Sequence, residues 1–101
     1  MPMLSTRGAA AVSESTAILR GLAPDGGLYV PQTFPHFSLD EIAALSALDY
    51  QARALTILQK FLPDFTADEL KNAIAGAYDT GFDDAQIAPV RPVGTWAHAL
   101  E

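Results

Sequence analysis

The run Ser5-Thr6-Arg7-Gly8 combines residue types that suit the binding of an anion. Two hydroxyl groups and a guanidinium beside a glycine can hold a phosphate or a carboxylate, because the planar guanidinium donates two parallel hydrogen bonds to such a group. A strand end with one surface arginine explains the same run, and the run by itself favours that simpler interpretation. The turn Asp25-Gly26-Gly27 leaves a similar choice between an anion-binding nest of backbone N–H groups and an ordinary turn before a strand.

The other polar residues do not form a pattern typical of metal binding or nucleophilic catalysis. His36 and His98 are the only histidines, neither has a second ligand at metal-binding spacing, and the chain has no cysteine. The serines lack the Gly-x-Ser-x-Gly context of a hydrolase. The neighbouring acids at 68–69 and 83–84 are typical of a helix start and a solvated loop. We therefore expect no metal site and no nucleophile.

The two lysines, Lys60 and Lys71, fall on the expected exposed sides of helices. A lysine that forms a Schiff base needs a desolvated pocket that lowers its pKa, so both are better interpreted as solubilising residues. The residues taken alone thus predict no self-contained active site.

Length and composition fit one small domain with a modest core. The chain has 101 residues, of which 50% are hydrophobic and 18% are charged, with a formal net charge of -6. These values argue against intrinsic disorder, and the acidic balance argues against nucleic acid as a partner. No segment has the pattern of a signal peptide or of a membrane span, so a cytoplasmic protein is the default expectation.

Capping and turn residues place the elements that must position these side chains. Ser13, Asp49 and the capping boxes Ser38/Glu41 and Thr66/Glu69 mark helix starts, and Gly21, Pro63 and Gly81 mark ends. They predict, in order, a short strand within 1–8, a helix over 14–20, a turn at 24–27, a strand at 28–30, a helix over 39–48, a helix after 49 that reaches 61, a helix between 66 and 81, an irregular strand within 87–93 and a last strand over 96–100. The expected class is α+β, a small, mostly helical domain with about four helices and a few short strands.

The spacing of the apolar residues predicts which side chains are covered. Phe34 and Phe37, on an extended connector that begins at Pro31, are expected to be buried. The residues Leu39, Ile42, Leu45 and Leu48 form an apolar stripe at helical spacing. Trp96, His98 and Leu100 alternate along the last expected strand, so they should share one face. That strand has no terminating signal, which suggests a piece of something longer.

One long run, Gly21-Leu22-Ala23-Pro24-Asp25-Gly26-Gly27-Leu28-Tyr29-Val30-Pro31, is specific enough to compare with known families. It is accompanied, in chain order, by Ser5-Thr6-Arg7-Gly8, Val12-Ser13, Ala17-Ile18-Leu19, Leu48-Asp49-Tyr50-Gln51, Asp68-Glu69-Leu70-Lys71, Ala77-Tyr78 and Ile87-Ala88-Pro89-Val90. Together these runs resemble the N-terminal domain of the threonine synthase family, and the resemblance spans residues 5–101. One departure is Glu14, which stands where the family commonly has an aromatic residue after the Val-Ser pair.

The resemblance implies a parent enzyme of fold type II that uses pyridoxal phosphate. Such an enzyme is a carbon–oxygen lyase of threonine biosynthesis that converts O-phosphohomoserine and water to L-threonine and phosphate. The family's Schiff-base lysine lies in a Phe-Lys-Asp motif that would follow residue 101. Residues 1–101 are accordingly expected to form a single N-terminal domain without catalytic or cofactor-binding residues, inactive alone, with the catalytic pyridoxal phosphate domain of the same chain as its partner.

Two roles for the domain stay open. In the structural role, which we favour, the domain packs on the catalytic domain and Trp96, His98 and Leu100 lie at the junction. In the binding role, Ser5, Thr6 and Arg7 reach the cleft and help to hold the phosphate of a small phosphorylated amino-acid substrate. The alternatives to threonine synthase itself are a threonine synthase-like phospholyase and a stand-alone interaction module.

Overall fold

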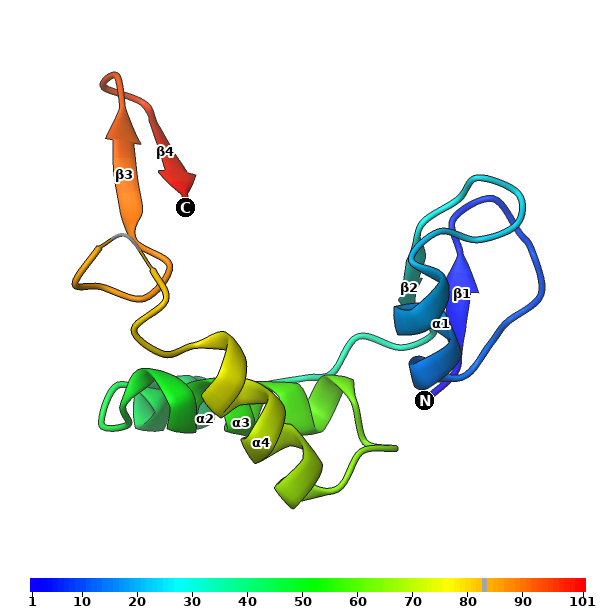
Figure 1. Ribbon diagram of the computed structural model, residues 1–101, viewed down its shortest axis with the longest axis horizontal. Coiled ribbons are helices and arrows are strands. Elements are labelled where there is room, and N and C mark those ends of the chain that lie inside the picture. Colours follow the sequence, from blue (N-terminus) through cyan, green and yellow to red (C-terminus); the bar gives the residue numbers. More distant parts are fainter. Residues whose placement is uncertain (83) are drawn as a thin grey trace.

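A computed structural model describes residues 1–82 and 84–101, and it contains four helices and four short strands (Figure 1). Their order is β1 (Met3–Ser5), α1 (Glu14–Arg20), β2 (Tyr29–Pro31), α2 (Leu39–Leu45), α3 (Tyr50–Phe61), α4 (Ala67–Ala77), β3 (Val90–Val93) and β4 (Ala97–Leu100). The predicted α+β class with about four helices is confirmed. The loop expected at 82–84 includes Asp83, which lies outside the described residues.

The N-terminal lobe, residues 1–31, combines α1 with a two-stranded sheet. β1 runs antiparallel to β2, with Met3 opposite Pro31 and Ser5 opposite Tyr29. The helix over 14–20 is confirmed at both ends: Ser13 accepts a hydrogen bond from the Thr16 N–H, and Gly21 follows with a φ of 75°. Pro31 was expected to stop strand pairing but closes β2 instead, because a proline is tolerated at the end of an edge strand.

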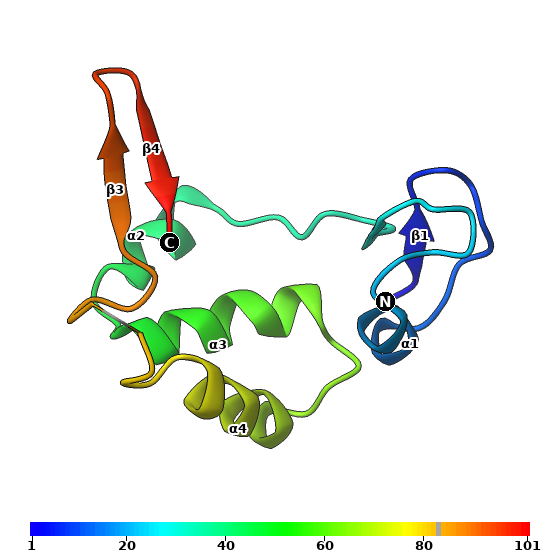
Figure 2. The same ribbon diagram turned by 45° about the horizontal axis from the view of Figure 1, so that its top comes forward.

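The helical layer, residues 38–78, holds the most deeply buried aliphatic side chains. α3 and α4 pack against each other, Leu70 and Ile74 of α4 are buried, and the rings of Tyr50 and Tyr78 meet edge to face at 5.1 Å. Both predicted capping boxes form, at Ser38 with Glu41 and at Thr66 with Glu69. Figure 2 shows the long connector that joins this layer to the N-terminal lobe.

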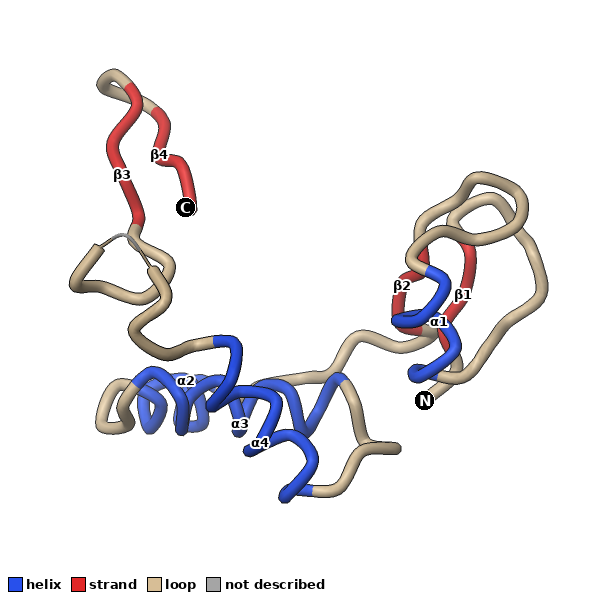
Figure 3. The backbone as a smooth tube through the Cα atoms, in the orientation of Figure 1, coloured by secondary structure: helices blue, strands red, loops and turns tan. Residues whose placement is uncertain are grey.

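The C-terminal hairpin, residues 90–100, stands away from the helices (Figure 3). β3 pairs with β4 antiparallel, with Val90 opposite Leu100 and Pro92 opposite His98. Gly94, with a φ of 74°, provides the left-handed residue that the tight connection needs. Trp96 lies in this connection, so β4 begins one residue later than predicted.

Two predicted helices are longer than the observed ones. α2 stops at Leu45 instead of 48, because the N–H and the hydroxyl of Ser46 both turn back to the carbonyl of Ala43. This tighter bonding ends the α-helical pattern before Asp49 caps α3. α4 ends at Ala77, four residues before the predicted stop at Gly81.

Several predicted core residues are exposed. Phe34 is 72% exposed, and Phe37 is only half-buried. Leu39 and Ile42 of the expected stripe on α2 are 84% and 52% exposed. Helical spacing shows which side chains share a face, but a face is buried only when another element covers it. No described element covers this side of α2.

The whole chain is more open than a compact domain of its size. It exposes 7165 Å² of accessible surface, and its Cα radius of gyration is 15.9 Å. Scaling relations for compact single domains give roughly 5,500 Å² and roughly 12.7 Å for a chain of this mass and length. Within the described residues, no helix is long and apolar enough to cross a membrane.

Candidate functional site

Two loops of the N-terminal lobe lie side by side where β1 ends and β2 begins. The Thr6 N–H donates to the carbonyl of Leu28 at 2.9 Å, and the Leu28 N–H donates to the Thr6 hydroxyl at 3.0 Å. These bonds extend the β1–β2 pairing into the loops. The run Ser5-Thr6-Arg7 and the turn Asp25-Gly26-Gly27, which are about twenty residues apart in the sequence, therefore meet at one site.

The Asp25 carboxylate is the centre of this site. Its Oδ1 accepts from the Ser5 hydroxyl at 2.7 Å and from the Gly27 N–H at 2.9 Å. Its Oδ2 accepts from the Ala9 N–H at 2.7 Å. These donors favour the ionised form, so the pKa of Asp25 lies below its usual value, first because of the Ser5 hydroxyl and then because of the Gly27 N–H. We call Ser5, Thr6, Arg7, Asp25 and Gly27 the Asp25 cluster.

Gly27 is required by the close approach of the two loops. A Cβ atom at this position would overlap the Ser5 hydroxyl and lie 3.0 Å from the Arg7 backbone nitrogen. At Gly26 the backbone φ is 77°, a left-handed conformation that favours glycine, and a Cβ there would lie 2.9 Å from Arg7 Nη1. The two glycines thus allow Ser5, Arg7 and Asp25 to pack together.

Of the three residues predicted to bind an anion, Thr6 and Arg7 are exposed and Ser5 is buried. Ser5 is buried and its hydroxyl donates to Asp25, while the Thr6 hydroxyl accepts from Leu28. Arg7 is exposed, and its Nη1 donates to the Asp25 carbonyl at 3.3 Å. Within residues 1–82 and 84–101 no carboxylate pairs with this guanidinium. The arrangement can hold an anion through Arg7, and it contains no activated nucleophile.

Lys60 does not have the surroundings of a Schiff-base lysine. Its Nζ donates to Glu41 at 2.7 Å and to the His36 carbonyl at 2.9 Å, and it lies 4.1 Å from the centre of the Phe37 ring. The Lys60 ammonium is the main reason why the pKa of Glu41 is lowered to about 2. Lys60 was expected only to aid solubility. Instead, from α3 it contacts both the connector, at His36, and α2, at Glu41.

The described residues do not fit pyridoxal phosphate. Lys71, the other lysine, is exposed on α4 beside a shallow hollow that holds no cationic partner for a phosphate. A Schiff-base lysine needs a desolvated pocket, and neither Lys60 nor Lys71 is buried. We therefore derive no catalytic step through this cofactor from the present residues.

The sequence patterns missed the role of Glu14, whose side chain is fully buried. Its Oε2 accepts from the Asp64 N–H at 3.1 Å and from the Met1 ammonium at 2.8 Å, whereas its Oε1 has no partner among the described residues. The hydrogen bond to Glu14, followed by that to Asp64, raises the pKa of the ammonium. Glu14 thus joins the N-terminal lobe to the loop before α4, a contact between residues 50 positions apart that no local pattern predicts.

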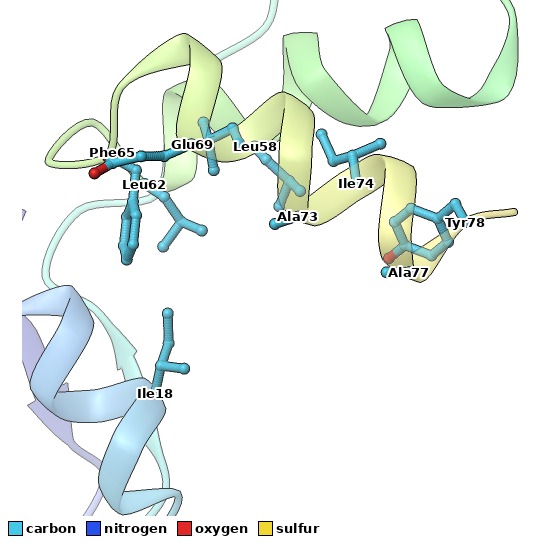
Figure 4. A pocket seen from close by; sticks show the side chains of 10 residues that line it. Ile18, Leu58, Leu62, Phe65, Glu69, Ala73, Ile74, Ala77 and Tyr78 are labelled. Carbon is cyan, nitrogen blue, oxygen red and sulfur yellow. The ribbon is translucent and has the colours of Figure 1, made fainter.

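An apolar groove lies beside this junction, between α1 and the α3–α4 pair (Figure 4). Its volume is about 430 Å³, and Ile18 of α1 faces Leu62 and Phe65 across it. The remaining lining residues are Leu58, Glu69, Leu70, Ala73, Ile74, Ala77 and Tyr78. With one carboxylate and one phenol as its polar side chains, the groove has the character of a packing surface.

A family model described as threonine synthase N terminus matches residues 3–78, which include the Asp25 cluster and all four helices. The chain belongs to the threonine synthase N-terminal family. The resemblance expected from the sequence is therefore confirmed over both the N-terminal lobe and the helical layer.

Individual threonine synthases are similar to this chain over most or all of its length. The enzyme of Methylobacillus glycogenes is 43% identical over 79 residues, which are 77% of this chain and 17% of that protein. The enzyme of Pseudomonas aeruginosa is 40% identical over 103 residues, which cover 100% of this chain and 22% of that protein. The crystal structure of threonine synthase from Brucella melitensis with bound pyridoxal phosphate matches with a TM-score of 0.78 and 34% identity, over 100% of this chain and 22% of that one.

The chain spans about one fifth of the length of these relatives. The family model ends before the hairpin, whereas the structural match includes it. The hairpin thus has a counterpart in the solved enzyme.

Proposed function

We propose that this chain is the N-terminal part of a threonine synthase, a lyase that converts O-phosphohomoserine and water to L-threonine and phosphate. The observation that carries the proposal is the match of all 101 residues to an enzyme with bound pyridoxal phosphate, at a TM-score of 0.78. Because the match covers 22% of that enzyme, the partner of this chain is the catalytic part that makes up the remainder. We expect the enzyme to act in the cytoplasm.

The catalytic groups belong to that remainder in this proposal. Pyridoxal phosphate supplies an electron sink when it is bound. Both lysines among the present residues lie in exposed or ion-paired positions, which supports a Schiff-base lysine elsewhere and an inactive N-terminal domain. The role of this domain is then structural, and it forms part of the wall of the enzyme's cleft.

The full reading frame that contains this segment provides the test. The purified product should show the visible absorbance of a pyridoxal phosphate Schiff base and should release phosphate from O-phosphohomoserine. Bound cofactor with release only from other phosphorylated amino acids would support the threonine synthase-like phospholyase. A product without cofactor and without phosphate release would contradict the proposal and leave a stand-alone interaction module.

Within the enzyme, we propose that Arg7 binds the phosphate of the substrate. Ser5 and Thr6 are positioning residues, because their hydroxyls hold the two loops together through Asp25 and Leu28. The Arg7 guanidinium donates one hydrogen bond to the Asp25 carbonyl, and the side chain is otherwise exposed to solvent. Its remaining N–H groups are therefore free to donate to a phosphate.

Replacement of Arg7 by alanine separates this role from a structural one. Loss of a charge-assisted hydrogen bond predicts a rise in KM of about tenfold or more, with little change in the melting temperature because the side chain is exposed. Arg20→Ala is the matched control, since Arg20 is also exposed and its nearest polar contact is the Tyr29 hydroxyl at 3.5 Å. A lowered melting temperature with an unchanged KM in Arg7→Ala would contradict phosphate binding.

A further inference from the structure

The loop that carries Arg7 is held at three consecutive backbone N–H groups. The Arg7 N–H donates to the Ser5 hydroxyl at 3.1 Å, and the Gly8 N–H donates to the Ser5 carbonyl at 3.2 Å. The Ala9 N–H donates to Oδ2 of Asp25 at 2.7 Å. These bonds restrict the backbone of the loop, so they fix the base of the Arg7 side chain relative to the rest of the N-terminal lobe.

Asp25 supports this loop on both sides of Arg7. The Ser5 hydroxyl that accepts from the Arg7 N–H donates its own proton to the Asp25 carboxylate, at 2.7 Å from Oδ1 and 3.0 Å from Oδ2. A hydroxyl can donate and accept at the same time, so Ser5 links the carboxylate to the Arg7 backbone. On the other side of Arg7, the carboxylate accepts directly from Ala9. The backbone carbonyl of Asp25 also accepts from Arg7 Nη1 at 3.3 Å.

The Asp25 carboxylate does not form an ion pair with the guanidinium that it supports. In the described part of the chain, the ion pairs of arginine and lysine side chains involve Arg91 and Lys60 only. The donors to the Asp25 carboxylate are neutral groups instead: one hydroxyl and two backbone N–H groups. An ion pair would occupy the guanidinium N–H groups that a phosphate needs. Asp25 therefore holds the Arg7 loop and leaves the charge of Arg7 available to an anion.

We propose that Asp25 is the residue that positions Arg7 for binding of the substrate phosphate, an inference that rests on the function proposed above. Its carboxylate holds the backbone on both sides of Arg7, and its carbonyl orients the guanidinium. Asparagine cannot replace it, because the side-chain oxygens of Asp25 accept from both Gly27 and Ala9. An amide NH2 in place of either oxygen would face a second N–H donor. Arg7 alone contacts the phosphate, and Asp25 acts only through it.

A double-mutant cycle in the full-length enzyme tests the inference. Asp25→Asn should raise the KM for O-phosphohomoserine about fivefold or more and change kcat less than about twofold, at a temperature where circular dichroism shows the variant to be folded. In an Arg7→Ala background, Asp25→Asn should leave the KM at the value of Arg7→Ala alone. A purely structural role would instead give effects of the two substitutions that multiply. Asp40→Asn is the matched control, because Asp40 is exposed on α2 and lies outside the Asp25 cluster. The control should keep the KM of the wild type.

Ser5→Ala keeps the inference testable if Asp25→Asn does not fold. It removes the hydroxyl between Asp25 and the Arg7 N–H, whereas the Gly27 and Ala9 bonds to the carboxylate need no hydroxyl. The KM should rise in Ser5→Ala and should not rise further when Ser5→Ala is added to Arg7→Ala.

A wild-type KM in the folded variant, Asp25→Asn or Ser5→Ala, would overturn the inference. An increase in KM that multiplies with that of Arg7→Ala would overturn it as well. Both outcomes leave the proposed enzyme activity intact. A wild-type protein that releases no phosphate from O-phosphohomoserine would contradict the proposed function, and the inference with it.

Discussion

The Asp25 cluster and the β3–β4 hairpin differ in how far the chain itself covers their side chains. In the cluster, both carboxylate oxygens of Asp25 accept hydrogen bonds and the Ser5 side chain is buried. In the hairpin, Val90, Trp96 and Leu100 expose most of their apolar surface to water. The cluster is completed by residues of this chain, whereas the described residues leave these hairpin side chains uncovered.

Gly27→Ala should produce the largest effect, because it breaks the cluster sterically. The added Cβ would overlap the Ser5 hydroxyl and press on the Arg7 backbone. Overpacking of this kind predicts a loss of about 1–3 kcal/mol in the free energy of unfolding. Urea denaturation measures the loss.

Gly76→Ala is the matched control for that variant. Gly76 lies in α4, and beyond the backbone of that helix an added Cβ would have no atom within 4 Å. Alanine should therefore stabilise the helix by about 0.5–1 kcal/mol, because it has the higher helix propensity. Equal effects of the two substitutions would show that the close approach of the loops does not hold in solution.

Asp25→Asn should produce a smaller, pH-dependent effect. The pKa of Asp25 is lower in the folded chain than its unfolded value of about 3.9, so its ionised form stabilises the fold above that pH. The contribution is lost as the pH falls through the lowered pKa. The wild type should therefore exceed Asp25→Asn in stability at neutral pH and lose this advantage below about pH 4. A difference that is constant between pH 7 and pH 3 would contradict the ionised cluster.

Trp96→Ala in the 101-residue chain should produce the smallest effect. Its side chain is 88% exposed, so its removal should change the free energy of unfolding by less than about 0.5 kcal/mol. The same substitution in the full-length enzyme should be clearly destabilising if the catalytic part covers the Trp96 side chain there. Thermal denaturation of the two pairs of proteins measures the contrast, and identical effects would remove the distinction between the cluster and the hairpin.

Local signals in the sequence were enough to predict the helix starts. Ser13, Asp49 and Thr66 cap helices where expected, because a cap depends on a side chain and an N–H within the same turn. The resemblance to the threonine synthase family was also available from the sequence, through the run that contains Asp25, and the comparisons confirm it.

Contacts between distant residues could not be predicted in this way. The meeting of Ser5 with Asp25 and the burial of Glu14 against Asp64 depend on how loops cross in three dimensions. The exposure of Phe34 and Leu39 was missed for the related reason that apolar spacing does not show whether a covering element exists. The predicted roles of Ser5, Thr6 and Arg7 in substrate binding remain predictions.

Hydrogen exchange on the 101-residue chain and on the full-length enzyme is the most direct test of the account. It shows whether the Asp25 cluster forms without the rest of the enzyme and whether the hairpin is protected only in its presence. The account predicts that the amides of Ala9 and Gly27 exchange equally slowly in both proteins, because their acceptor, Asp25, belongs to this chain. It predicts that the amides of β3 and β4 exchange quickly in the 101-residue chain and slowly in the full-length enzyme. Hairpin amides that exchange at the same rate in both proteins would contradict it.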